Sequence, residues 1–222
     1  TLVNNTARVG GGLGTYDGAT VTLLNVTIAG NSATISGGGI ASKVVYSPEA
    51  IFNLYNSIVA NNTGGDCSFA SLPLNTNTAN FFGDATCDGT ADGDPLLDAL
   101  ANNGGPTQTM ALQAGSPAID AGNNTAAAAL TWDQRGDPYS RLLNGTVDIG
   151  AYESEPLAPP APGNVVATAG VESASVTFDP VSGAISYTAT CTSSDGGAPG
   201  SATLASPPAP PVTVNQLTAG TT

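Results

Sequence analysis

Residues 25–62 read NVTIAGNSATISGGGIASKVVYSPEAIFNLYNSIVANN, and the end of this stretch repeats its beginning. The segment Asn25-Val-Thr-Ile-Ala-x-Asn31 returns as Asn56-Ser-Ile-Val-Ala-x-Asn62, 31 residues further along the chain. A repeat with a period of about 20–50 residues is typical of structural units that stack along one axis. The apolar runs inside the repeat are too short for helices and suit strands. The stretch therefore predicts stacked coils of β-strands.

Two more repeats extend this pattern toward the N-terminus. Asn5-x-Ala7 returns as Asn31-x-Ala33 after 26 residues, and Gly10-Gly-Gly-Leu13 returns as Gly37-Gly-Gly-Ile40 after 27 residues. Asparagine suits the corners of stacked coils because it tolerates left-handed backbone and can hydrogen-bond to its neighbour one coil away. Glycine suits the sharpest bends. We expect residues 1 to about 66 to form such coils.

The composition agrees with a β protein. Only 9% of the 222 residues are charged, while 28 are glycine and 16 are proline. Helical proteins usually carry many Lys and Glu residues on their surfaces, whereas many short strands joined by tight turns need glycine and proline. Regular Val, Ile and Leu runs, with 41% apolar residues overall, argue against disorder. We predict an all-β fold.

The charge balance excludes two classes of partner. Four basic residues stand against 17 acidic ones, there is no histidine, and the net charge is −13. Nucleic-acid binding needs clustered Lys and Arg, so we expect no nucleic-acid partner. An anionic membrane surface would repel the chain, and no apolar run is long enough to span a bilayer. We therefore expect no direct insertion into a membrane.

Three cysteines bear on the redox compartment. Cys67 and Cys87 flank a loop-rich segment, and in an oxidising compartment we expect them to form a disulfide. Cys191 is left over as a free thiol. A metal site built from cysteine alone is the weaker alternative, because the spacing matches no zinc pattern and the chain lacks histidine.

An acidic run spans Cys87 and raises the question of a cofactor. It contains Asp84, Asp88, Asp92 and Asp94, separated by small residues and glycine. Calcium prefers several oxygen ligands, so a calcium loop is one interpretation. The spacing and the closing glutamate of an EF-hand are missing, and a run of solvated turns is the favoured alternative. We assign no other cofactor or metal.

The middle of the chain carries its most specific motifs. Residues 100–122 read LANNGGPTQTMALQAGSPAIDAG, residues 133–136 read DQRG, and residues 148–153 read DIGAYE. Together they resemble the closing segment of bacterial surface proteins with a choice-of-anchor Q domain. The resemblance implies a right-handed parallel β-helix of the pectate-lyase-like type over residues 1–153. Residues 67–153 would then form its last coil and a C-terminal cap over the open strand edges.

The C-terminal part looks like a separate domain. Residues 154–162 form a Pro-rich linker that should be extended and stiff. Alternating strands follow in residues 163–222, separated by Gly, Pro and Ser. The expected strands are Val165–Ala169, Ala174–Phe178, Ile185–Cys191 and Val212–Leu217. They resemble a fibronectin type III domain that stops before its sixth strand, so we expect an incomplete sandwich and a chain cut from a longer secreted protein.

Two arginines form a candidate site within the motif region. Arg135 and Arg141 are half of the chain's basic residues, and the acids Asp120, Asp133, Asp148 and Glu153 lie close to them in sequence. One interpretation is a clamp for a carboxylate ligand, because Arg binds carboxylates through two parallel hydrogen bonds. The other is a structural ion pair, which the resemblance favours because it places these residues in the cap. We expect Arg135 to be at least half buried and bonded to an acid of the cap, with Asp148 or Asp120 as the first choices.

Two aromatic residues could contact a ligand. Trp132 and Tyr152 could each stack on a sugar ring, but neither belongs to a recognisable aromatic platform, and packing within the cap is the favoured use for both.

The acids of the coils argue against catalysis. Asp17, Glu49 and Asp66 are scattered, whereas glycoside hydrolysis needs two facing carboxylates. We therefore expect a non-catalytic, extracellular, structural or adhesive region of a bacterial surface protein, with glycans or surface proteins as partners. The alternative is a fragment of a polysaccharide-active lyase or hydrolase, or of a carbohydrate-binding β-helix protein.

Overall fold

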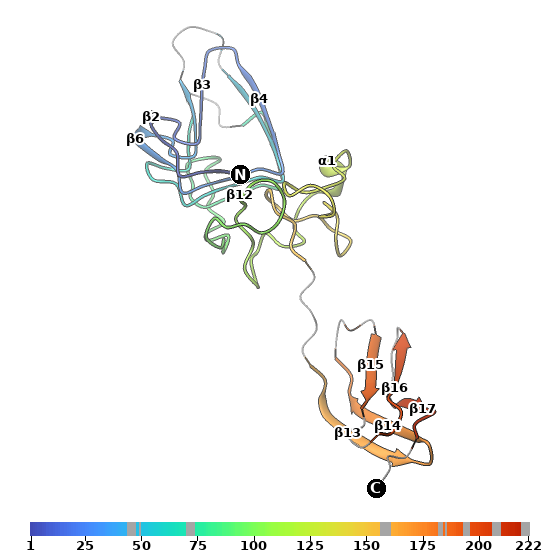
Figure 1. Cartoon of the computed structure of the whole chain (residues 1–222). Coiled ribbons are helices and arrows are strands. Elements are labelled where there is room, and N and C mark those ends of the chain that lie inside the picture. Colours follow the sequence, from blue (N-terminus) through green and yellow to red (C-terminus); the bar gives the residue numbers. More distant parts are fainter. Residues whose placement is uncertain are drawn as a thin grey trace. The chain divides into compact units, whose positions relative to one another are not determined.

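The computed structural model describes residues 1–43, 48, 50–69, 74–155, 161–181, 184, 186–192, 196–205 and 210–218. The chain divides into two units, Thr1–Pro156 and Leu157–Thr222 (Figure 1). In the described residues no helix is long and apolar enough to cross a membrane. Most of the expected Pro-rich linker, residues 156–160, lies outside the described residues.

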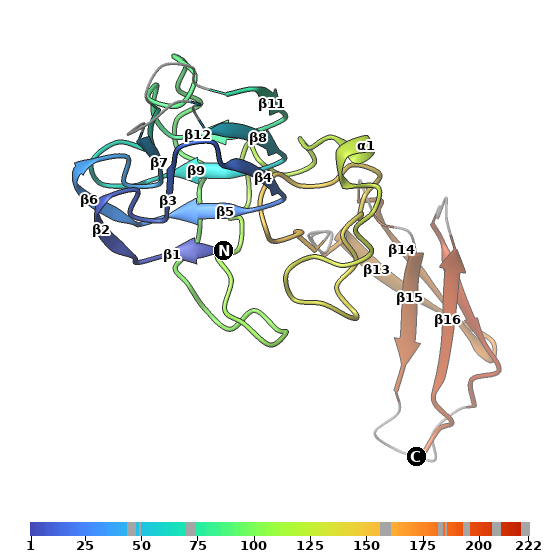
Figure 2. The ribbon, with the colours of Figure 1, turned by 90° about the horizontal axis from the view of Figure 1, so that it is seen from above.

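Unit 1 is built from parallel strands that pair with the strand one repeat later. The longest series of neighbours, here sheet A, runs β1-β5-β9-β12, and Figure 2 shows β1, β5 and β9 side by side as arrows pointing the same way. Its strands are β1 (Leu2–Val3), β5 (Thr27–Ala29), β9 (Ile58–Ala60) and β12 (Phe81–Phe82). Parallel pairs need long connections, and here those connections are the other strands of the repeat.

Three further parallel sheets complete the repeat. Their strands are β2 (Thr6–Val9) with β6 (Ser32–Ser36); β3 (Leu13–Tyr16), β7 (Ile40–Lys43) and β10 (Cys67–Ser68); and β4 (Thr20–Leu24), β8 (Ile51–Tyr55) and β11 (Thr76–Thr78). The all-β prediction is confirmed.

The register of these pairs confirms the sequence repeats. Ile28 pairs with Val59, Ala7 with Ala33, and Leu13 with Ile40, which are the offsets of 31, 26 and 27 residues expected from the sequence. Each repeated residue therefore lies directly beside its counterpart.

The asparagine corners also behave as expected. Asn25 and Asn56 have φ angles of 51° and 47°, in the left-handed region. A second corner, at Asn5, Asn31 and Asn62, forms a ladder: the Asn5 side chain donates to Asn31 Oδ1 at 2.9 Å, and that of Asn31 donates to Asn62 Oδ1 at 3.1 Å. Both bonds satisfy the amide of Asn31, which is buried and would be costly to leave unpaired.

The glycine triplets have a second cause besides tight bending. A Cβ on Gly11 would lie 2.5 Å from the carbonyl oxygen of Gly38, and one on Gly38 would lie 2.2 Å from that of Thr63. Successive repeats thus approach so closely at this corner that only glycine fits. Gly10 and Gly37 do provide the expected turn, with φ angles of 66° and 63°.

Sheet A is buried on both faces, which explains its apolar sequence. Ile28, Val59 and Phe82 point inward and join a core with residues of the other sheets, among them Ile40 and Leu54. Successive side chains alternate across a strand, so their neighbours face outward.

The outward face of sheet A is covered by the motif region. Ile58 and Phe81 pack there with Leu112, Ala118 and Ile149. Residues 67–153 therefore contribute both strands that pair along the sheet edges, β10, β11 and β12, and a segment that packs on this face. The edge of β12 is closed by Asp92, whose N–H donates to Phe82 O and whose carboxylate accepts from Phe82 N, both at 2.8 Å.

The motif region itself is mostly turns. Its one-turn helix α1 (Asn124–Ala127) begins after Asn123, whose side chain accepts a hydrogen bond from the N–H of Ala126. The Asn123 N–H in turn donates to Asn56 Oδ1 at 2.7 Å, which ties this segment to the asparagine corner of unit 1.

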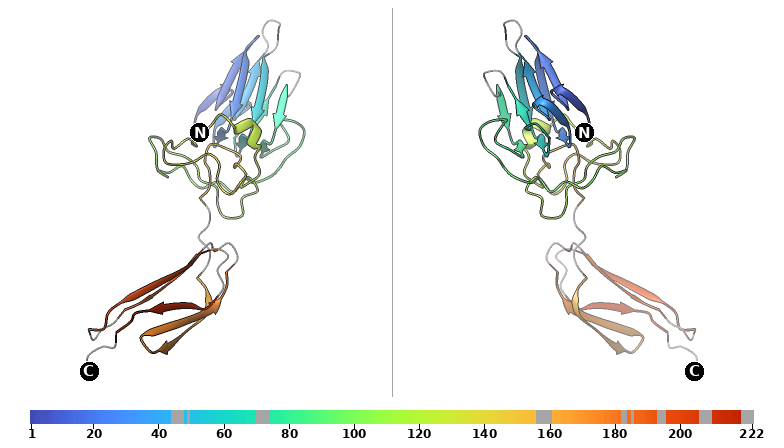
Figure 3. Two further views of the ribbon diagram at one scale, coloured as in Figure 1. Left: turned by 90° about the vertical axis from the view of Figure 1, so that its right-hand side faces the viewer. Right: turned by 90° about the vertical axis from the view of Figure 1, so that its left-hand side faces the viewer.

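Unit 2 consists of antiparallel strands in two sheets (Figures 1 and 3). Its strands are β13 (Gly163–Gly170), β14 (Ser173–Asp179) and β17 (Val212–Asn215) in one sheet, and β15 (Ser186–Cys191) and β16 (Gly200–Ala205) in the other. Phe178 and Tyr187 stack with ring centroids 4.3 Å apart beside buried Val212 and Val214.

Four strands of unit 2 lie where the sequence places them, and one was missed. Ile185, the first residue of one expected strand, lies outside the described residues. The missed strand, β16, reads GSATLA, whose small residues give little apolar signal. Cys191 is free, as expected.

Candidate functional site

The guanidinium of Arg135 is surrounded by hydrogen-bond acceptors and aromatic rings. Its guanidinium is 2% exposed; Nε donates to Asp133 Oδ2 at 2.9 Å, and Nη2 donates to the carbonyl oxygen of Glu153 at 2.7 Å. The rings of Tyr139 and Tyr152 lie on it, with centroids 3.9 and 4.0 Å from Cζ. A buried guanidinium needs such hydrogen bonds and ring contacts to offset its lost hydration.

A tight turn brings Asp133 to Arg135. The N–H of Gly136 donates to Asp133 O at 3.1 Å, and Asp133 Oδ1 accepts from the N–H of Arg135 at 2.7 Å. Gly136 has a φ of 79°, a conformation that glycine adopts without strain. The DQRG sequence therefore encodes both the turn and the ion pair.

Arg141 is buried beside this shell. It is 1% exposed and pairs with the carboxylate of Glu153, and its Nη1 donates to Gly150 O at 3.0 Å. Glu153 also accepts from the N–H groups of Asp148, at 2.9 Å, and Leu143, at 3.2 Å. Burial raises the pKa of the Glu153 carboxyl to about 7, against the opposing effect of these donors.

The expected burial of Arg135 and its bond to a nearby acid are confirmed, but the first-choice partners are wrong. Neither Asp148 nor Asp120 forms an ion pair with an arginine in the described residues; Asp133 and Glu155 pair with Arg135, and Glu153 pairs with Arg141. The Asp148 carboxylate instead accepts from the N–H groups of Asp120, at 2.7 Å, and Ser154, at 2.6 Å. Asp120 is exposed, and desolvation and then the charge of Asp148 raise its pKa.

The glycines of the motifs let the chain converge on the arginines. A Cβ on Gly104 would lie 2.0 Å from the Tyr139 hydroxyl, and one on Gly105 would lie 2.3 Å from Arg135 O. A Cβ on Gly150 would lie 2.8 Å from Ile58 Cδ1. The NNGGP, DQRG and DIG segments thus meet at one place, and the arginines link them. These contacts favour the structural interpretation of the pair over the ligand clamp.

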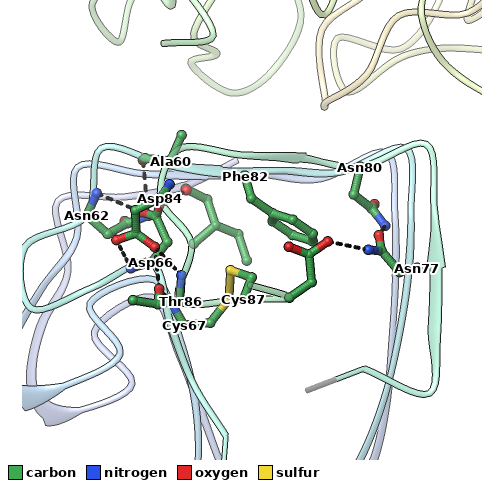
Figure 4. The surroundings of a disulfide bond; sticks show 12 residues. Ala60, Asn62, Asp66, Cys67, Asn77, Asn80, Phe82, Asp84, Thr86 and Cys87 are labelled. Carbon is green, nitrogen blue, oxygen red and sulfur yellow. Dashed lines mark hydrogen bonds between the residues drawn. A yellow bond between two sulfur atoms is a disulfide. The ribbon is translucent and has the colours of Figure 1, made fainter. Parts of the chain in front are cut away.

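The predicted disulfide is present. Cys67 and Cys87 are joined with an S–S distance of 2.02 Å, and Figure 4 shows the bond beside the ring of Phe82. Both half-cystines are buried in the inner core. A disulfide of this kind indicates folding in an oxidising, extracellular environment.

Next to the disulfide the asparagine ladder ends in two aspartates (Figure 4). Asp66 Oδ1 accepts from the side chain of Asn62 at 2.9 Å, and Asp66 and Asp84 exchange backbone N–H to carboxylate bonds of 3.0 Å each. Burial raises the pKa of Asp66. The ladder's donors all point toward Asp66, so its last member must be a pure acceptor, which a carboxylate is.

The acidic run does not converge. Asp88 binds the N–H of Thr90 at 2.9 Å, Asp92 binds that of Phe82, Asp94 binds that of Leu96 at 2.9 Å, and Asp84 belongs to the ladder. In the described residues no three acids, cysteines or histidines gather as a metal site would require. Asp84, Asp88 and Asp94 each accept from the N–H two residues later, as in a turn, and Asp92 pairs with β12. These bonds fit the interpretation as a run of turns.

The two candidate aromatic residues have different environments. Tyr152 packs on Arg135, which is the favoured use. Trp132 is 41% exposed and lines a pocket of about 290 Å³. The residues around this Trp132 pocket are Thr1, Leu24, Asn25, Leu130, Trp132, Asp133, Gln134, Arg141 and Ala151. It is one of the surface pockets of unit 1, and in the sequence only Trp132 pointed to it.

No family model matches the chain, and no curated protein and no solved structure is significantly similar to it. The fold and the pocket therefore have to be interpreted from this chain's own contacts.

Proposed function

We propose that the chain is a non-catalytic, extracellular, structural and adhesive region of a bacterial surface protein. In this proposal unit 1 is a right-handed parallel β-helix of the choice-of-anchor Q type, and unit 2 is fibronectin type III-like. The in-register stacking of repeats supports the first assignment, and the two antiparallel sheets around Phe178 and Tyr187 support the second.

One observation carries the non-catalytic part of the proposal. The buried ionisable side chains of unit 1 are engaged in links between chain segments: Arg135 with Asp133, Arg141 with Glu153, and Asp66 with Asn62 and Asp84. A general acid or base must reach a substrate proton, and these groups are instead held by partners within unit 1, which supports a non-catalytic role. The disulfide supports secretion.

The test measures both adhesion of the chain to coated surfaces and its turnover of polysaccharides. Beads coated with the intact chain should adhere to at least one surface of a panel coated with neutral polysaccharides and extracellular proteins, whereas beads coated with the heat-denatured chain should not. The soluble chain should release neither reducing ends nor unsaturated products from pectin, alginate or glucans. Product release, or equal adhesion of native and denatured chain, would contradict the proposal.

Carbohydrate binding is the second candidate, and the Trp132 pocket is the observation that favours it. A carbohydrate-binding role is compatible with adhesion but requires a defined pocket.

A further inference from the structure

We infer that the Trp132 pocket binds one ring of a neutral pyranose sugar, with the indole of Trp132 as the stacking surface. The inference deepens the proposed adhesive function and rests on it, because it supplies a ligand class for adhesion. It concerns a site separate in role from the arginine contacts, which hold the chain together.

Trp132 lies on a short antiparallel ribbon that leaves its side chain partly exposed to solvent. Trp132 forms an antiparallel bridge with Ser140, and the N–H of Arg141 donates to Thr131 O at 2.9 Å. Arg141 on this short ribbon is buried, while Leu130, Trp132 and Leu142 are 37%, 41% and 48% exposed. The buried arginine therefore anchors a ribbon whose large apolar side chains remain accessible.

The pocket offers both apolar and polar neutral surface. Leu24, Leu130 and Ala151 supply apolar atoms next to the indole. Asn25 and Gln134 add carboxamides that are held in place by hydrogen bonds within unit 1, to Asp148 O and to Gln108 O respectively. Its volume of about 290 Å³ lies at the lower end of ligand pockets, which are typically ~300–1,000 Å³. This size suits one sugar ring better than a long chain.

The paired side-chain charges of the pocket favour a neutral ligand. Arg141 and Asp133 line it, but each is already paired with a buried partner, Glu153 and Arg135 respectively. The pocket thus presents no unpaired charge from these two residues. The terminal ammonium of Thr1 also lines it and donates to the uncharged side chain of Gln134. The net charge of −13 further disfavours polyanions such as uronates.

A sugar matches this combination better than a purely apolar ligand. A pyranose ring has an apolar face that can lie on an indole and hydroxyls around its edge, and Trp combines a large apolar surface with one N–H donor. Within the part of the chain that the structure describes, the indole N–H of Trp132 makes no hydrogen bond, so it is available to a hydroxyl.

Tryptophan fluorescence reports on this pocket directly, because Trp132 is the only tryptophan of the chain. Tryptophan emission of the intact protein should change saturably on titration with neutral sugars, using glucose, galactose, mannose, N-acetylglucosamine and their short oligomers as probes. A ligand of this size should bind with a dissociation constant of about 1 mM. Polygalacturonate and a short alkyl glycol serve as the charged and apolar comparison probes.

Two variants test whether the indole of Trp132 is the surface that binds the sugar. Trp132→Ala should weaken binding at least about tenfold, measured by calorimetry because the variant lacks tryptophan emission. Leu142→Ala is the matched control: it is similarly exposed on the same ribbon but does not line the pocket, and it should bind as the parent does. Circular dichroism checks that both variants are folded.

The outcomes separate the pocket from adhesion in general. Loss of sugar binding in Trp132→Ala while coated beads still adhere would support the pocket and place adhesion elsewhere. Absence of any saturable response to the neutral probes, equal binding by Trp132→Ala, or tighter binding of the charged or apolar probe would overturn the inference, even if the beads adhere.

Discussion

At the scale of single residues, Arg135 shows how one side chain can organise a region that lacks regular secondary structure. It connects the Asp133 turn, the Glu153 backbone and two tyrosine rings, all within its own reach. Lysine could replace its charge but not its planar fork or its stacking between rings. The residue is therefore a structural centre of the motif region.

Replacing Arg135 should be costly for this reason. We expect Arg135→Ala to lower the free energy of unfolding of unit 1 by about 3–5 kcal/mol, because it leaves the Asp133 carboxylate buried without its partner. Arg135→Lys should recover only part of the loss. Urea denaturation followed by circular dichroism measures both, and a change below about 1 kcal/mol for Arg135→Ala would show that the shell carries little stability.

Asp66 gives a second prediction at this scale. Asp66→Asn would place an amide N–H₂ opposite either the Asn62 donors or the Asp84 N–H, so one donor would lose its acceptor. We expect a loss of about 1–3 kcal/mol. Asp94→Asn is the control, since that exposed carboxylate accepts from only Leu96 N. Equal stability of the two variants would argue against the ladder's directionality.

At the scale of elements, the sequence repeats were enough to predict which strands lie beside which. Ile28 beside Val59 and Leu13 beside Ile40 follow directly from the offsets, because stacking places like residues together. The outward face of sheet A was not predicted, since an apolar residue such as Ile58 reads the same whether it faces the core or a covering segment. The acids around the arginines were named from the sequence, but the choice among them was wrong, because several acids lie within reach along the chain.

The close contact of Gly150 with sheet A can be tested with a matched pair of glycines. Gly150 has a φ of 106°, and a Cβ there would meet Ile58 and Thr27; Gly115 has a φ of 85° with nothing within 4 Å. Both substitutions by alanine incur backbone strain, but only Gly150→Ala adds overpacking. We expect it to cost about 1–3 kcal/mol more than Gly115→Ala in urea unfolding. Equal losses of stability in the two variants would mean that the segment around Gly150 can move away from sheet A at no energetic cost.

The disulfide belongs to the same scale, because it links β10 to the loop after β12. The double variant Cys67→Ala, Cys87→Ala should lose about 3 kcal/mol of stability in the chain-entropy description. Cys191→Ser, which removes the free thiol, should leave unit 1 unchanged. If reduction of the parent protein does not lower its urea midpoint, the bond contributes little beyond the packed core around it.

At the scale of the whole molecule, the two units have separate cores and separate strand pairings. Unit 1 is organised around Ile28, Leu54 and Phe82, and unit 2 around Phe178 and Val214. Cooperative unfolding follows shared contacts, so each core should define its own transition. The Pro-rich composition between them also favours independent behaviour.

We therefore expect two transitions when the intact chain is heated in a scanning calorimeter. Arg135→Ala should lower only the transition of unit 1. Phe178→Ala removes a buried ring and its contact with Tyr187, so it should lower only that of unit 2, by a loss of about 3–5 kcal/mol. A single transition that both substitutions shift together would mean that the units unfold as one, because independent cores cannot transmit the loss of one side chain to each other.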